Sequence, residues 1–247
     1  MRLTVLGAGP AYTDRVGATG AAYLLSSADD HLLLDLGQGS LPRLFAAIEP
    51  SALSAVVVSH LHPDHFIDLV ALRHYLRYQL DPPRRLRVVG PRGLDARLDA
   101  LHADPRFSAE AFDVEGLSVG ARNIGVFGIE SARVTHTEDS YAFRVTADGA
   151  SLVYSGDCGR AEDLDALLRP GDALLVEVSF GPGPVPAGAL HLDGPAIGEL
   201  AARARPGRVL LTHLQMGFDP DETIESVARQ YDGAVEFVWP GSVIDLG

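Results

Sequence analysis

Residues 59–65 have the sequence Ser59-His60-Leu61-His62-Pro63-Asp64-His65, which places four potential metal ligands within six positions. The apolar run Ala55–Ser59 leads into it and predicts a buried strand, and the helical periodicity of Phe66–Leu80 follows it. A loop at the end of a strand can turn these side chains into one pocket, whereas consecutive strand residues point to opposite faces. Three imidazoles and a carboxylate so close together favour a metal site over a polar surface loop, and they suit zinc, manganese or iron.

Further candidate ligands lie where other predicted strands end. His136 follows the predicted strand Ala132–Thr135, and His213 follows Arg208–Thr212. Asp157 comes just after another predicted strand, in Ser155-Gly156-Asp157-Cys158-Gly159, where the flanking glycines allow the backbone to approach closely. Since one carboxylate can bridge two cations, Asp157 fits a site with many histidine ligands.

The order of predicted elements indicates an α/β fold, a four-layer αββα sandwich of two sheets with helices on both outer faces. No convincing linker divides the chain, so we expect one domain over residues 1–247, with the Pro/Gly-rich stretch Gly181–Gly188 as an active-site loop. The predicted helices are Gln38–Ile48, Phe66–Leu80, Gly93–Leu101, Pro195–Ala204 (with Asp193 as its cap) and Glu222–Gln230. The predicted strands are Leu3–Leu6, Ala21–Ser26, His31–Leu36, Ala55–Ser59, Leu86–Val89, Asn123–Ile129, Ala132–Thr135, Tyr141–Thr146, Ser151–Tyr154, Ala173–Val178, Arg208–Thr212 and Val235–Val238.

Composition limits the classes of partner. The chain has 247 residues and a formal net charge of −13, so its surface repels nucleic-acid phosphates at long range and bulk nucleic-acid binding is not expected. Cys158 is the only cysteine, which excludes an intrachain disulfide and fits a reducing compartment. The N-terminus has no signal-like apolar run, and no stretch approaches the roughly 18–20 apolar residues of a membrane span. We therefore expect a soluble, cytoplasmic protein without membrane contact; a homodimer is compatible with the sequence.

These motifs, in this order, resemble those of the metallo-β-lactamase superfamily, in the branch that contains ribonuclease Z and related phosphodiesterases. The first motif matches Leu33–Gly39, and the second is the histidine-rich stretch quoted above. The later motifs match His136, Asp157 and His213. The resemblance implies that His60, His62 and His136 hold one metal ion, that Asp64, His65 and His213 hold the other, and that Asp157 bridges them. It also implies that Asp35 orients the metal-binding loop through hydrogen bonds.

Two further sequence motifs indicate a branch of this superfamily. Leu175–Ser179, which contains Glu177, and Leu190–Asp193, which contains His191, resemble the paired motifs of ribonuclease Z and related phosphodiesterases. There the histidine lies near the scissile phosphate and the glutamate supports it. The antibiotic-hydrolysing enzymes typically have a thiolate or serine at the fourth motif, where this chain has Asp157; Cys158 is one position late for that role.

The interval between the third and fourth motifs is short. His136 and Asp157 lie 21 positions apart, and one predicted hairpin fills the span. Ribonuclease Z has a long arm for tRNA in this interval, so we expect that arm to be missing. Some compact bacterial relatives without it resemble cyclic-nucleotide phosphodiesterases.

The sequence therefore predicts a hydrolase with two divalent metal ions, zinc first and manganese or iron as alternatives, acting on a small or cyclic nucleotide phosphodiester. Two cations about 3.5–4 Å apart would lower the pKa of a shared water, which would attack phosphorus. The residues expected to act in catalysis are Asp64, Glu177 and His191. Three alternatives remain open: an RNA-processing endonuclease like ribonuclease Z, a carboxylic ester, thioester or lactone hydrolase, and a non-catalytic metal sensor.

Overall fold

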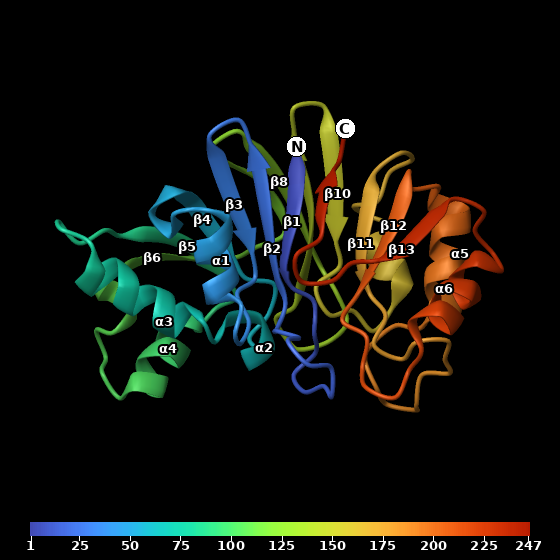
Figure 1. The fold of residues 1–247 in the computed structure, drawn as a ribbon, viewed down its shortest axis with the longest axis horizontal. Coiled ribbons are helices and arrows are strands. Elements are labelled where there is room, and N and C mark those ends of the chain that lie inside the picture. Colours follow the sequence, from blue (N-terminus) through green and yellow to red (C-terminus); the bar gives the residue numbers. More distant parts are fainter.

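Two seven-stranded sheets lie face to face in the computed structural model, which describes residues 1–247, and helices cover the outer face of each sheet (Figure 1). The predicted four-layer αββα sandwich is confirmed. The two chain ends lie side by side at the upper edge of the view, where the Leu246 N–H donates to the Met1 carbonyl oxygen at 3.0 Å. None of the helices has the length and apolarity of a membrane-spanning segment.

The N-terminal sheet has the strand order β14-β1-β2-β3-β4-β5-β6. Strands β14, β1, β2 and β3 pair antiparallel, and β3 to β6 pair parallel. Both faces of its central strands are covered, because Tyr23 and Leu25 face the other sheet while Leu24 faces the helices. The bounds are β1 Arg2–Gly7, β2 Ala22–Ser27, β3 Asp30–Leu34, β4 Leu53–Val57, β5 Leu86–Gly90, β6 Phe112–Gly116 and β14 Val243–Asp245.

The C-terminal sheet has the order β13-β12-β11-β10-β9-β8-β7. Strands β7 to β10 form an antiparallel meander, and β10 to β13 run parallel. The bounds are β7 Gly120–Ile124, β8 Phe127–Arg133, β9 Tyr141–Ala147, β10 Ala150–Tyr154, β11 Ala173–Glu177, β12 Arg208–Thr212 and β13 Ala234–Phe237.

Helices α1 to α4 flank the first sheet, and α5 and α6 flank the second. Asp193 accepts a hydrogen bond from the Ala196 N–H and caps α5, as predicted, and Asp219 caps α6 in the same way. The bounds are α1 Leu41–Ala47, α2 Pro63–Phe66, α3 Leu69–His74, α4 Leu94–His102, α5 Gly194–Ala204 and α6 Pro220–Ala228. Single turns are η1 Pro50–Ala52, η3 Ser108–Glu110 and η4 Ala161–Leu164, with a π-helical turn, η2, at Tyr75–Gln79.

Three separate apolar cores correspond to the four layers. One lies between the sheets, one between the N-terminal sheet and α1 to α4, and one between the C-terminal sheet and α5 and α6. Each fully buried leucine or phenylalanine contributes roughly 1.5–3 kcal/mol to folding. These cores hold the strand ends rigidly, so the loops that leave them have fixed starting points.

Three predicted elements differ from the structure. The predicted strand Asn123–Ile129 spans the end of β7, a two-residue turn and the start of β8: Gly125 has φ +55°, and Val126 at the tip is exposed. The predicted strand Ala132–Thr135 is not a separate strand, because β8 runs as far as Arg133 and ends there. The predicted helix Phe66–Leu80 is broken into α2, α3 and η2. The Asp68 N–H donates to the carbonyl of Leu36 at 3.1 Å instead of extending α2, so a tertiary backbone contact outweighs helical periodicity. Strands β6 and β14 were not predicted.

The carboxyl ends of β3, β4, β11 and β12 lie at one edge of the sandwich, together with the loops that follow β8 and β10. This is the lower edge in Figure 1, where α2 lies between the two sheets. Parallel strands place their carboxyl ends at the same edge, which is the usual position of ligands in α/β sheets. All of the candidate site residues are carried to this edge.

Candidate metal centre

The histidine-rich loop leaves β4 and turns into α2, with His62 at the N-cap and Pro63 at the first helical position. Proline here fixes the backbone angle that starts a helix, so the chain turns sharply after His62. His60, Asp64 and His65 are buried, while His62 is exposed. The loop therefore points most of its potential ligands inward rather than into solvent.

Asp35, just after β3, holds this loop in place through hydrogen bonds. It adopts a left-handed backbone conformation with φ +58° and is fully buried. Its Oδ1 accepts from the Ser59 N–H at 2.6 Å, and its Oδ2 accepts from the Ser59 hydroxyl at 2.7 Å. Oδ2 also accepts from His65 Nδ1 at 2.8 Å and from the Tyr154 hydroxyl at 2.7 Å. A carboxylate with this many donors fixes both the loop backbone and one imidazole.

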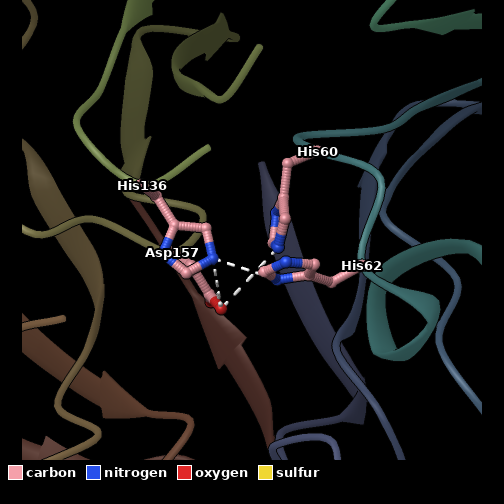
Figure 2. Close-up of side chains that lie close together, drawn as sticks. All are labelled: His60, His62, His136 and Asp157. Atoms are coloured by element: carbon pink, nitrogen blue, oxygen red, sulfur yellow. Dashed lines mark hydrogen bonds and ion pairs between the residues drawn. The ribbon is translucent and has the colours of Figure 1, made fainter. Parts of the chain in front are cut away.

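A first group of ligand atoms contains His60, His62, His136 and one oxygen of Asp157 (Figure 2). His136 Nε2 lies 3.0 Å from His62 Nδ1 and 3.6 Å from Asp157 Oδ2. His60 Nε2 lies 3.7 Å from the same Asp157 oxygen. The three rings converge on a single point in front of that carboxylate oxygen.

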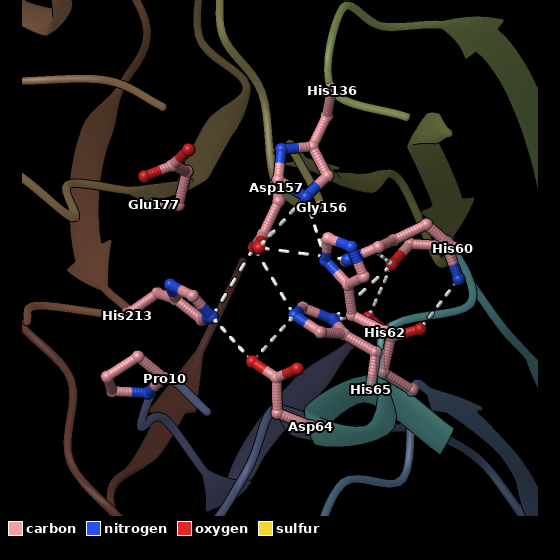
Figure 3. A network of polar contacts seen from close by, with 12 residues as sticks. Pro10, His60, His62, Asp64, His65, His136, Gly156, Asp157, Glu177 and His213 are labelled. Atoms are coloured by element: carbon pink, nitrogen blue, oxygen red, sulfur yellow. Dashed lines mark hydrogen bonds and ion pairs between the residues drawn. The ribbon is translucent and has the colours of Figure 1, made fainter. Parts of the chain in front are cut away.

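A second group contains Asp64, His65, His213 and the other oxygen of Asp157 (Figure 3). His65 Nε2 lies 3.3 Å and His213 Nε2 lies 3.5 Å from Asp157 Oδ1. Asp64 Oδ2 lies 3.3 Å from His213 Nε2 and 3.7 Å from His65 Nε2. The structure thus brings all seven predicted ligands together, in two groups that share only Asp157.

The far nitrogen of each buried ring has a partner that sets its tautomer. His60 Nδ1 faces the Ser59 hydroxyl at 3.1 Å, and that hydroxyl donates to Asp35, so the ring must be the donor. His213 Nδ1 likewise donates to the Ser179 hydroxyl at 3.1 Å, and His136 Nδ1 donates to the Leu190 carbonyl at 2.8 Å. In the neutral rings Nε2 is therefore left as a lone-pair nitrogen that faces the centre.

Orphaned atoms show that these residues fit metal ions. His60 Nε2, His65 Nε2 and Asp157 Oδ1 are fully buried and have no hydrogen-bond partner. Leaving buried polar atoms without partners costs roughly 1–3 kcal/mol each. A tetrahedral zinc ion with ligands at about 2.0–2.1 Å spaces those ligands about 3.3 Å apart. The distances of 3.0–3.7 Å within each group match this spacing.

The charges of the site agree with cation binding. Burial opposes ionisation of Asp157, but the charges of His213 and His65 outweigh it and hold the pKa of Asp157 well below its usual range. Burial, reinforced by the neighbouring charge of His65, lowers the pKa of His60 well below its usual value. Burial also opposes charge on His65 and His213, but Asp157 outweighs it and raises the pKa of both rings, so a cation that binds the second group displaces their protons.

His191 and Glu177 form a pair beside this centre. His191 Nδ1 donates to Glu177 Oε1 at 2.9 Å and lies 3.9 Å from Asp157 Oδ2. The His191 side chain is 19 % exposed, and its Nε2 makes no hydrogen bond. Burial disfavours the charged ring, but the hydrogen bond and charge of Glu177, with the charge of Asp157, outweigh it and raise the pKa of His191 to about 9.

Three residues that sequence reasoning missed connect these parts. The Ser179 hydroxyl donates to Glu177 Oε2 at 2.7 Å and contacts both His191 and His213. Ser59 and Tyr154 complete the partners of Asp35. Ser59 adjoins the histidine motif and Ser179 lies two positions after Glu177, so their proximity in sequence was a usable signal. Nothing in the sequence around Tyr154 indicates its contact with Asp35.

We expect the Asp35→Ala substitution to weaken metal binding by the second group of ligand atoms by about 10- to 100-fold, the usual cost of losing an outer hydrogen-bonding partner. The reason is that His65 and the Ser59 backbone would lose their acceptor. Zinc titration against a competing chelator measures the change. Tyr154→Phe is the matched control, because it removes one donor to Asp35 and leaves the others, and it should alter affinity less. Equal affinities in D35A and the parent protein, with unchanged thermal unfolding, would contradict the role of Asp35.

Cys158 lies beside Asp157 but is turned away from the metal centre. Its thiol is buried and donates to the Arg160 carbonyl at 3.0 Å. Burial raises the pKa of the Cys158 thiol far above its usual value, so little thiolate is present. We expect a disulfide reagent at about pH 8 to leave the folded protein unmodified and to label one thiol per chain in guanidinium chloride. Rapid labelling of the folded protein, or loss of zinc in Cys158→Ala, would show instead that the thiol faces the site.

Known proteins are similar to this chain over most or all of its length. A family model described as a beta-lactamase superfamily domain matches residues 33–214. An uncharacterized protein of Mycobacterium leprae is 33% identical, covering 100% of this chain and 89% of its own length. A ribonuclease Z of Mycobacterium bovis is 30% identical, covering 71% of this chain and 69% of its own. The crystal structure of YhfI, a metallo-beta-lactamase fold protein from Bacillus subtilis, has a TM-score of 0.87 at 24% identity and covers 98% of both chains.

Proposed function

Because this chain belongs to the metallo-β-lactamase superfamily of metal-dependent hydrolases, we propose that it is a phosphodiesterase of small or cyclic nucleotides. The enzyme would use two divalent ions, with zinc as the first candidate. The single observation that carries the proposal is the His191–Glu177 pair beside the two ligand groups. A buried carboxylate that holds an imidazole in its charged form suits proton donation to a phosphoryl or leaving-group oxygen.

The protein's own groups have separate tasks in this reaction. Divalent ions held by the two groups would lower the pKa of a water molecule and offset charge on the phosphoryl oxygens. His191, with Nε2 free, donates a hydrogen bond to a phosphoryl oxygen or a proton to the leaving oxygen. Glu177 keeps that ring protonated and orients it. Asp64, whose pKa is lowered by its contacts with His213 and His65 against the effect of burial, stays a carboxylate at neutral pH.

The relatives support a phosphodiester as the reacting group. The similar protein of Mycobacterium bovis is a ribonuclease Z, and ribonucleases cleave phosphodiesters. The proposal therefore ranks a carboxylic ester, thioester or lactone below a phosphodiester.

The size of the site supports a small substrate over a long RNA. The β9–β10 hairpin occupies the interval between His136 and Asp157, so no arm projects there. A cavity of about 330 Å³ opens on the ligand groups, at the lower end of the range for small-molecule sites. A net charge of −13 opposes long-range attraction of a polyanion.

The test compares substrates on the same zinc- or manganese-loaded protein, with metal content measured in parallel. The substrates are bis(p-nitrophenyl) phosphate, p-nitrophenyl butyrate, a lactone, cyclic nucleotides and short RNA with a 3′ extension. Turnover of phosphodiesters and cyclic nucleotides alone is expected. Turnover of the acyl ester or lactone alone overturns the proposal, preference for RNA moves it to an endonuclease, and a loaded but inert protein indicates a metal sensor.

A further inference from the structure

A loop that joins β1 to β2 forms the outer wall of the metal centre. The cavity of about 330 Å³ is lined on one side by the ligand groups and on the other by Pro10, Ala11 and Tyr12. Figure 3 shows Pro10 beside His213 and Asp64 at the rim of the site. The apolar wall therefore faces the groups where a scissile ester would bind.

Arg15 ties this wall to the segment that follows His213. Its Nη1 donates to the Leu214 carbonyl at 2.8 Å, and its Nη2 donates to the carbonyls of Gln215 at 3.3 Å and Phe218 at 3.2 Å. At the base of the loop, the His213 N–H donates to the Ala8 carbonyl at 2.9 Å. These hydrogen bonds hold the β1–β2 loop against the end of β12, next to the candidate ligand His213.

Tyr12 is left open on this wall. The residue is 67 % exposed and its side chain makes no hydrogen bond, although it lines the cavity. Neither lysine nor arginine lines the cavity, which disfavours a second phosphate there, and the Gln215 amide offers both a donor and an acceptor. A flat aromatic face with one amide nearby fits a planar heteroaromatic ring with polar edges.

We propose that Tyr12 is the stacking platform for the base of a nucleotide whose phosphate ester lies at the metal centre, and that Arg15 is the positioning residue that holds it there. The inference rests on the proposed function and names the part of the substrate that gives specificity. Stacking between a base and an aromatic side chain is sequence-tolerant, because every base has a π face. Removing the ring should weaken nucleotide binding by about tenfold to a hundredfold.

Paired substrates with one leaving group test the assignment. Thymidine 5′-(p-nitrophenyl phosphate) and methyl p-nitrophenyl phosphate share the scissile bond and differ in the nucleoside. We expect Tyr12→Ala to raise KM for the nucleoside ester by about tenfold or more, with kcat little changed, and to leave the methyl ester unaffected. Tyr12→Phe should behave like the parent protein. Val16→Ala, on the same loop but fully exposed and outside the cavity, is the matched control.

A binding measurement separates this inference from the proposed function. Calorimetry with the zinc-loaded protein should show that Y12A weakens binding of adenosine 5′-monophosphate but not of methyl phosphate. Arg15→Ala should have the same effect, and the double variant should add nothing, since Arg15 acts through Tyr12. Equal losses for both ligands, or no loss in Y12A, overturn the stacking role. A parent protein that cleaves neither phosphodiester would instead refute the proposed function.

Discussion

Replacing His191 with alanine lowers phosphodiester turnover by about 10²–10⁴-fold, the usual contribution of a positioned proton donor, while bound metal stays at the parent level. The ring donates to Glu177 through Nδ1 and leaves Nε2 free, so its removal takes away a proton donor without removing a predicted ligand. Steady-state kinetics on bis(p-nitrophenyl) phosphate, with metal analysis of the same samples, measures both effects.

The pH dependence of turnover is a second test of the role of His191. His191 acts as the charged ring, so turnover falls as the pH rises through the pKa of His191. That pKa is about 9 without ions, and cations bound beside the ring favour its neutral form, so the alkaline limb lies below 9. This limb should be absent in H191A. His102→Ala is the control, because His102 is an exposed residue at the end of α4 that stacks on the buried Phe107, with ring centroids 4.2 Å apart, and it belongs to neither ligand group. Unchanged turnover in H191A would remove His191 from the mechanism.

Replacing Asp157 with asparagine abolishes binding of both ions together, and turnover with it. Asp157 is the only residue shared by the two ligand groups, one oxygen facing each. An amide has one oxygen and no negative charge, so one group would face an NH2 in place of an oxygen and the other would keep only a neutral oxygen. The loss of metal affinity should be larger than the loss of about 10- to 100-fold that follows removal of a hydrogen-bonding partner of a ligand. Equilibrium dialysis with zinc measures the stoichiometry.

Two comparisons make the Asp157 result specific. The parent protein stripped with a chelator should match D157N in turnover and should recover when zinc returns, whereas D157N should not. Asp219→Asn changes a carboxylate that caps α6 and should keep both ions. If D157N retains one ion at parent affinity, Asp157 belongs to one group only and the bridging arrangement is wrong.

Most of the architecture could be predicted from local patterns. The strand Ala55–Ser59 and the ligand motif after it were recognised because apolar runs and ligand spacing are properties of neighbouring residues. Asn123–Ile129 reads as one strand because its apolar residues continue across the turn at Gly125 and Val126, which joins two separate strands. Phe66–Leu80 reads as one helix because the spacing of its apolar residues carries no sign of the hydrogen bond from the Asp68 N–H to the Leu36 carbonyl.

Fold class, family and the kinds of side chain available to a metal follow from the amino-acid sequence, since they depend on order and spacing along the chain. Three features appear only once the chain is folded: which oxygen of Asp157 faces which histidines, the contact of Tyr154 with Asp35 from 119 positions away, and the reach of Arg15 to Leu214 across 199 positions. Contacts of this kind form when two sheets pack together. Their partners carry no local signature, because packing and not neighbourhood in the chain selects them.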